Sequence, residues 1–140
     1  MANIPGLRAD HVALRVADYD ETVAWYTEKL GFRVVTEWSQ GDAGLRLAYL
    51  ELKGFRLEIL AGGTPEPLDI ESVQDSFKRQ GYAHFCLKVD DMDAAVAELA
   101  RRDVELFTTP SDLPPSGNRL AFIRDNSGNV LELAQELRQQ

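Results

Sequence analysis

The chain has 140 residues, of which 44% are hydrophobic and 27% charged, the balance of an ordinary globular protein. Lys and Arg total 15 and Asp and Glu total 23, a net charge of −8 that excludes nucleic acid as the main partner and disfavours anionic membranes. A single cysteine excludes a disulfide framework and a multi-cysteine zinc site. The N-terminus lacks the basic start and apolar run of a secretory signal, and we predict a cytoplasmic protein.

The first half of the chain predicts a strand, a helix and three further strands. Residues 11–16 alternate and are rich in Val and Leu, which indicates a strand. Asp18 resembles a helix N-cap and Gly31 a helix stop, so a helix is predicted over about 19–30. The later strands are predicted at about 32–38, 45–52 and 55–60, with turns at Gly41-Asp42 and Lys53-Gly54.

The second half of the chain repeats this order of elements. The linker before it, 62–82, begins rich in Gly and Pro and is predicted to hold a short helix near 70–79. Another irregular stretch, 110–117, is predicted to be a mobile loop over a site. The remaining predicted elements are a strand at 83–89, a helix at about 91–102, and strands at about 104–109, 118–124 and 130–135.

Internal repetition accounts for this order. Residues 10–24 read DHVALRVADYDETVA and residues 83–97 read AHFCLKVDDMDAAVA, in register at an offset of 73. One inserted residue later, at an offset of 74, Leu57-Glu58 matches Leu131-Glu132. We therefore predict an α+β protein of two tandem βαβββ modules, over about 8–61 and 83–136.

Strand alternation gives each module one apolar and one polar face. The polar faces carry His11 and Glu58 in the first module, and His84 and Glu132 in the second. Two imidazoles and two carboxylates form a ligand set for a divalent transition metal. The alternative is a set of ordinary solvated strand residues, but that interpretation explains poorly why both histidines and both glutamates occupy matched positions.

At these residues the chain resembles the vicinal oxygen chelate superfamily, the glyoxalase/bleomycin resistance/extradiol dioxygenase group. The stretches that carry the resemblance are DHVALRV, ETVAWYTEKLGF, FRLEIL, AHFCLKVDDMDAAVAEL and LAFIRDNSGNVLELAQ. It implies curved mixed sheets around a metal cleft. It also implies one divalent ion per site (Ni, Co, Zn, Mn or Fe) held by His11, Glu58, His84 and Glu132. The set looks most like glyoxalase I, in which a ligand Glu moves a carbon-bound proton; Glu132 and Glu58 are thus the implied catalytic residues.

Three further residues are predicted to contact a small-molecule substrate. Arg15 matches a family position that helps bind glutathione, with an ion-pair role as the alternative. Trp38 lies at a strand end, where it suits the rim of a site, and Phe122 offers a stacking surface. Trp25 is predicted to be a helix core residue, and Cys86 a small residue lining the site rather than a nucleophile.

The resemblance implies several reactions on one fold. The first prediction is a glyoxalase-like lyase or isomerase whose substrate chelates the metal through adjacent oxygens, although the chain lacks the Asn after Glu58 that glyoxalase I uses. The main alternative is a metal-free antibiotic-binding protein of the bleomycin-resistance type. An extradiol dioxygenase would use His11, His84 and Glu132 as an iron triad, but no acid–base His is left. An epimerase-like isomerase would share the proton chemistry. A homodimer is expected.

Overall fold

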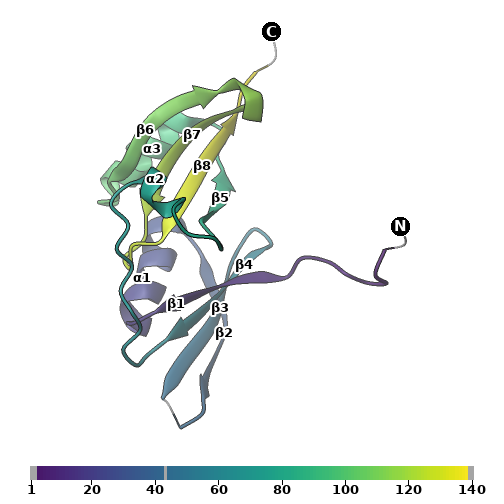
Figure 1. The fold of residues 1–140 in the computed structure, drawn as a ribbon, viewed down its shortest axis with the longest axis vertical. Coiled ribbons are helices and arrows are strands. Elements are labelled where there is room, and N and C mark those ends of the chain that lie inside the picture. Colours follow the sequence, from purple (N-terminus) through teal and green to yellow (C-terminus); the bar gives the residue numbers. More distant parts are fainter. Residues whose placement is uncertain (1–2, 43, 139–140) are drawn as a thin grey trace. The chain divides into compact units, whose positions relative to one another are not determined.

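Each half of the chain forms a mixed four-stranded sheet with a helix on one face (Figure 1). The computed structural model describes residues 3–42 and 44–138. The chain divides into two compact units with bounds at Met1–Pro65 and Glu66–Gln140. The two βαβββ modules confirm the predicted α+β fold class.

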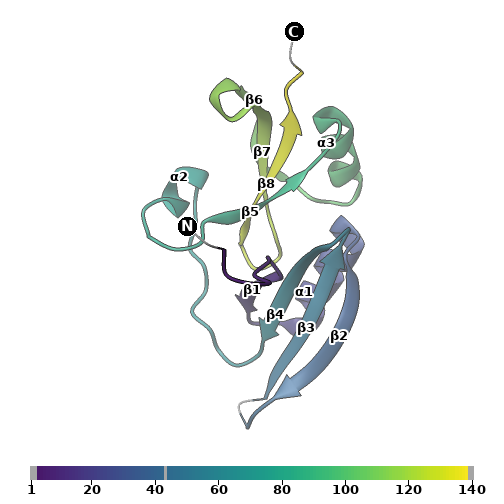
Figure 2. The same cartoon turned by 90° about the vertical axis from the view of Figure 1, so that its right-hand side faces the viewer.

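The first unit holds one helix and one sheet of order β1-β4-β3-β2. Strand β1 runs parallel to β4, and the other neighbours are antiparallel. Figure 2 shows α1 behind the sheet, where it packs across β2, β3 and β4. The elements are β1 (His11–Val16), α1 (Tyr19–Leu30), β2 (Arg33–Gln40), β3 (Leu45–Leu52) and β4 (Phe55–Ala61).

The second unit repeats this topology in the order β5-β8-β7-β6, with β5 parallel to β8. A short helix precedes the repeat within the predicted linker, and α3 packs on β8. The elements are α2 (Val73–Ser76), β5 (His84–Lys88), α3 (Met92–Arg101), β6 (Leu106–Leu113), the 3-10 turn η1 (Pro114–Ser116), β7 (Asn118–Arg124) and β8 (Val130–Glu136).

Local chemistry explains where these elements begin and end. The side chain of Asp18 accepts a hydrogen bond from the backbone N–H of Glu21 at 2.9 Å and caps α1, as Asp91 caps α3. The two-residue turn Lys53-Gly54 has positive φ at both positions, 47° and 88°, the geometry of a type I′ hairpin. It sets the register that places β4 against β3.

The apolar face of each sheet forms the core beneath its helix. Leu57 and Ile59 of β4 are fully buried there, together with Tyr26 of α1. Trp25, predicted as a helix core residue, is only half-buried, and its ring centroid lies 4.9 Å from that of Tyr26 in an edge-to-face arrangement. The prediction was wrong because adjacent helix positions point about 100° apart, and the sheet lies under Tyr26.

The predicted mobile loop at 110–117 is instead ordered secondary structure. Strand β6 continues to Leu113, and η1 follows directly. Pro110 lies within this strand, because β6 is an edge strand whose pairing with β7 shifts register between Thr108 and Ser111, on either side of the proline. A residue without an N–H is tolerated at such an irregularity on an edge.

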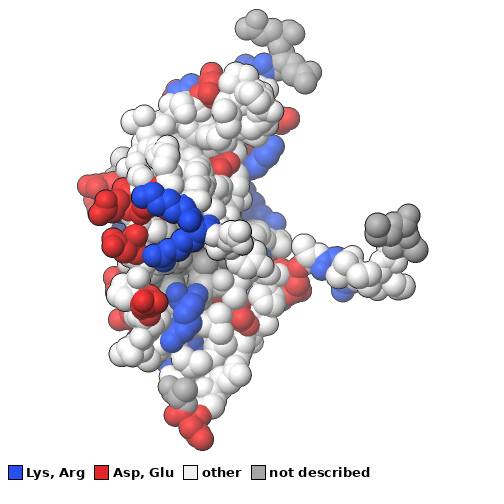
Figure 3. Space-filling model, in the orientation of Figure 1, with Lys and Arg blue, Asp and Glu red and all other residues white. Residues whose placement is uncertain are grey.

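The surface carries charges of both signs. Figure 3 shows acidic and basic side chains beside one another on the face drawn. Within residues 3–42 and 44–138, no helix is both long and apolar enough to cross a membrane.

Candidate functional site

The first unit brings a histidine, a tyrosine and a glutamate together on the sheet face opposite α1. Ala13 of β1 lies opposite Glu58 of β4, so His11 and Glu58 point to the same face from adjacent strands. Tyr49 lies opposite Glu58 on β3, and its ring centroid is 5.1 Å from that of His11. Burial and a hydrogen bond to Glu58 raise the pKa of Tyr49. We call His11, Tyr49 and Glu58 half-site 1.

The second unit builds the equivalent cluster in the same register. Cys86 of β5 and Phe122 of β7 both lie opposite Glu132 of β8. The Nε2 atom of His84 is 2.8 Å from Oε2 of Glu132, and its ring centroid is 5.2 Å from that of Phe122. We call His84, Phe122 and Glu132 half-site 2.

In each half-site the strand of the glutamate lies between those of the histidine and the aromatic residue, and the aromatic ring contacts the histidine. Tyr49 was not among the sequence candidates, although Phe122 was. The repeat itself carried the signal, because Tyr49 and Phe122 are related by the same offset of 73 as His11 and His84. Trp38 extends the aromatic surface of half-site 1, with its ring centroid 5.0 Å from that of Tyr49.

Arg15 is held by backbone rather than by an acidic side chain. Its guanidinium donates hydrogen bonds to the carbonyls of Val16, Leu60 and Gly62, the one to Leu60 at 3.1 Å. The ion pair considered for it is therefore absent from the described residues, and Asp10 instead contacts His11. These bonds secure the ends of β1 and β4, beyond the row that holds Glu58.

The donor atoms of each half-site suit a divalent metal ion. Asp10 Oδ2 lies 2.7 Å from His11 Nδ1, the carboxylate contact that typically orients a metal-binding imidazole and leaves Nε2 for the ion. In half-site 2, an imidazole and a carboxylate already face each other, and the buried Nδ1 of His84 has no hydrogen-bond partner among the described residues. An ion bound to this pair would replace the proton between them.

The four predicted metal ligands come from both units, two from each. Within the part of the chain that the structure describes, no three His, Cys, Asp or Glu side chains gather as a metal site. Each half-site supplies two ligands, so a four-ligand site needs one half-site of each kind. A hollow of about 520 Å³ elsewhere in the second unit contains none of the predicted site residues; it is lined by Pro114, Gly117, Glu136, Leu137 and Arg138.

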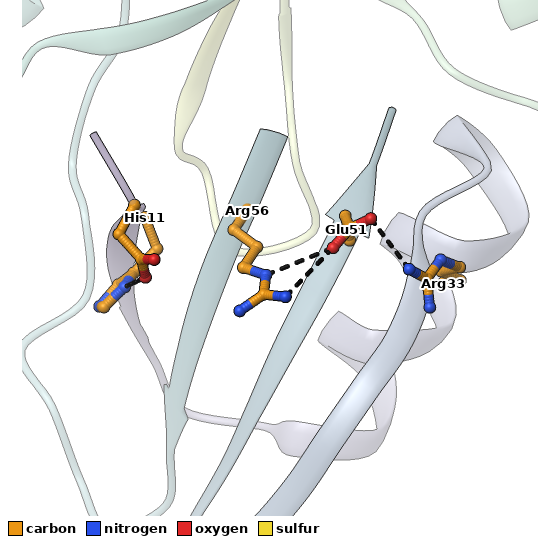
Figure 4. Close-up of polar contacts among 5 residues, drawn as sticks. His11, Arg33, Glu51 and Arg56 are labelled. Carbon is orange, nitrogen blue, oxygen red and sulfur yellow. Dashed lines mark hydrogen bonds and ion pairs between the residues drawn. The ribbon is translucent and has the colours of Figure 1, made fainter. Parts of the chain in front are cut away.

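A row of charged side chains crosses all four strands beside half-site 1 (Figure 4). His11 is paired in register with Arg56, Arg56 with Glu51, and Glu51 with Arg33. Arg33 Nη2 lies 2.9 Å from Oε1 of Glu51, while Nε and Nη2 of Arg56 each lie 3.3 Å from its Oε2. The hydrogen bonds from the two arginines hold the pKa of Glu51 below its usual range.

Cys86 reports on the charge of half-site 2. Burial of the thiol and the neighbouring Glu132 carboxylate raise its pKa to about 11, although the residue as a whole is exposed. At pH 8 only about one thiol in a thousand is then ionised, so we expect alkylation by iodoacetamide about 100-fold slower than for a free cysteine. The Glu132→Gln variant should react faster, because the charge that disfavours the thiolate is gone.

The control for this alkylation experiment is Glu136→Gln, which removes an exposed carboxylate at the end of the same strand. It should react at the wild-type rate. Equal rates for wild type and Glu132→Gln would show that Glu132 does not set the pKa of Cys86.

The repeated half-sites agree with what the chain matches in sequence. Residues 8–133 match the Glyoxalase/Bleomycin resistance protein/Dioxygenase superfamily. The chain belongs to this superfamily. Among solved structures, a glyoxalase family protein from Enterococcus faecalis superimposes with a TM-score of 0.80 at 25% identity, covering 94% of this chain and all of that one.

Three curated relatives of the superfamily differ in what is known of them. The uncharacterized protein YwkD of Bacillus subtilis is 29% identical over 90% of this chain and 94% of its own length. Human mitochondrial methylmalonyl-CoA epimerase is 27% identical over 91% and 73%. Lactoylglutathione lyase GLX1 of Arabidopsis thaliana is 25% identical over 89% of this chain but only 43% of its own.

Proposed function

We propose that the protein is a metal-dependent lyase or isomerase acting on a small substrate that chelates the ion through two adjacent oxygens. One divalent ion would be held by His11, Glu58, His84 and Glu132, one half-site coming from each kind of module. The observation that carries this proposal is that each module has a histidine, an aromatic residue and a glutamate in identical strand register. We also propose that the protein forms a homodimer, because modules of about 65 residues bury little surface alone. We propose a cytoplasmic location for it as well.

The chemistry follows from the acids and bases of the two half-sites. The ion, when bound, would act as a Lewis acid that makes a carbon-bound proton next to the chelating oxygens more acidic. Glu58 and Glu132 would accept and return that proton. An isomerisation of this kind moves a proton between two positions of the substrate, and one glutamate per half-site provides two bases for this transfer.

The relatives support proton-transfer chemistry over the alternatives. Two of them are named as an epimerase and a lyase, at 27% and 25% identity. A metal-free binder of a cationic drug would have no use for two matched His–Glu pairs.

Metal uptake tests this proposal directly. Protein stripped with a chelator and then offered Mn, Fe, Co, Ni or Zn should retain about one ion per site by elemental analysis. An ion at 100 times its Kd should stabilise the fold by about 2.7 kcal/mol, measured as a higher Tm. If none of the five metals binds and bleomycin binds the metal-free protein instead, the protein is a drug-binding member of the superfamily.

A further inference from the structure

The two half-sites share their metal-binding positions but not their surroundings. In the first unit the residue opposite the histidine in register is Arg56, half-buried. In the second unit the equivalent residue is Val130, which is buried. A module of this fold therefore accommodates an apolar side chain at this position, and the fold does not account for the arginine.

The position of Arg56 is held by its neighbours in the charged row. Glu51 contacts two of its guanidinium nitrogens at 3.3 Å, and Arg33 contacts the other oxygen of the same carboxylate. Figure 4 shows the third guanidinium nitrogen of Arg56 turned toward the His11 side of the row, without a contact to Glu51. The guanidinium carbon also lies 5.7 Å from the centroid of the Tyr49 ring.

The hydrogen-bond donors of this row are not all used. Glu51 is shared by two arginines, and Arg56 keeps one guanidinium nitrogen, Nη1, without a hydrogen bond among the described residues. A guanidinium fixed by a carboxylate, with N–H groups left over, is suited to bind a carboxylate or phosphate.

We propose that Arg56 is a specificity-determining residue that binds a carboxylate or phosphate group of the substrate beside half-site 1. The inference rests on the proposed function, since it places the chelating oxygens of the substrate at the ion and its anionic group at Arg56. The asymmetry between the modules follows naturally: the metal ligands act as a symmetric pair, whereas a substrate with one anionic end needs recognition on one side only.

Two hydroxamates provide a test, because a hydroxamate presents two adjacent oxygens to a metal ion. Acetohydroxamate has a neutral tail, and the monohydroxamate of succinic acid carries a carboxylate. Binding of both to the metal-loaded protein is measured by calorimetry for wild type, Arg56→Leu, Arg56→Lys and Arg33→Leu. Wild type should bind the carboxylate-bearing compound about tenfold more tightly, the contribution of one charge-assisted hydrogen bond.

Arg56→Leu should lose this preference while its affinity for acetohydroxamate and its metal content stay at wild-type values. Arg56→Lys, which keeps the charge without the planar fork, should retain part of the preference. Arg33→Leu is the matched control. Arg33 is the other partner of Glu51 and is exposed on the outer strand β2, so this variant should retain most of the preference.

The outcomes separate this inference from the proposed function. A wild type that binds both hydroxamates equally, or an Arg56→Leu variant that keeps the preference, overturns the role of Arg56 and leaves the metal enzyme standing. A wild type that takes up no metal and binds neither compound overturns both proposals together.

Discussion

The His84→Ala variant is expected to lose its divalent ion. His84 would supply one of four protein ligands, and its Nε2 lies 2.8 Å from the second ligand of half-site 2, Glu132. Changing a residue that merely supports a ligand costs about 10–100-fold in metal affinity, so the loss of a ligand should exceed about 100-fold. The metal content measured by elemental analysis after dialysis should fall from about one ion per site to a trace.

The equivalent position in the first module provides a second arm of the experiment. His11→Ala should have a similar effect, because the repeat assigns the two histidines the same role. Lys88→Ala, on the same strand and face as His84, is the control and should keep its metal. Full metal retention in both histidine variants, with an unchanged Tm, would contradict the four-ligand site.

The Leu57→Ala and Leu131→Ala variants are expected to have the largest effects on stability. These leucines occupy equivalent positions, one residue before each glutamate, and both are fully buried. Truncating a buried leucine removes its transfer free energy and leaves a cavity, which typically costs about 2–5 kcal/mol. That is a large share of the roughly 5–15 kcal/mol that stabilises a natural domain.

Urea unfolding measures this loss as a lower midpoint. The control is Leu7→Ala: this leucine is 73% exposed, and its truncation should change the free energy of unfolding by less than about 0.5 kcal/mol. A loss below about 1 kcal/mol in either core variant would mean that the sheet face opposite the half-sites is not the close-packed core described above.

Local signals predicted most of the fold. The strand at 11–16 and the helix at 19–30 have the predicted bounds. The helix begins at a capping aspartate and ends at a left-handed glycine at φ 81°, and both signals act within a few residues. Strand β6 was mispredicted because the tolerance for Pro110 depends on its edge position in the sheet, which no local pattern reveals.

The half-sites, like the fold, were predicted only in part from local sequence patterns. Alternation and the repeat were enough to place His11, Glu58, His84 and Glu132 on the polar faces. Neither pattern identifies the neighbour across the strands, which is set by register between segments far apart in the chain. The repeat relates Tyr49 to Phe122, but the contacts of Tyr49 with Glu58 and His11 emerged only with the folded sheet.

The sequence by itself determined the duplicated module, the order of its elements and the face on which each possible ligand lies, because strand and helix periodicity and turn chemistry act over a few residues. Only the tertiary structure decided which side chains touch. It gave half-site 1 a charged row in which Arg33 and Arg56 share Glu51, and it left half-site 2 apolar at Val130. The physical reason is that cross-strand contacts depend on hairpin turns, bulges and register, which combine only when the whole sheet forms.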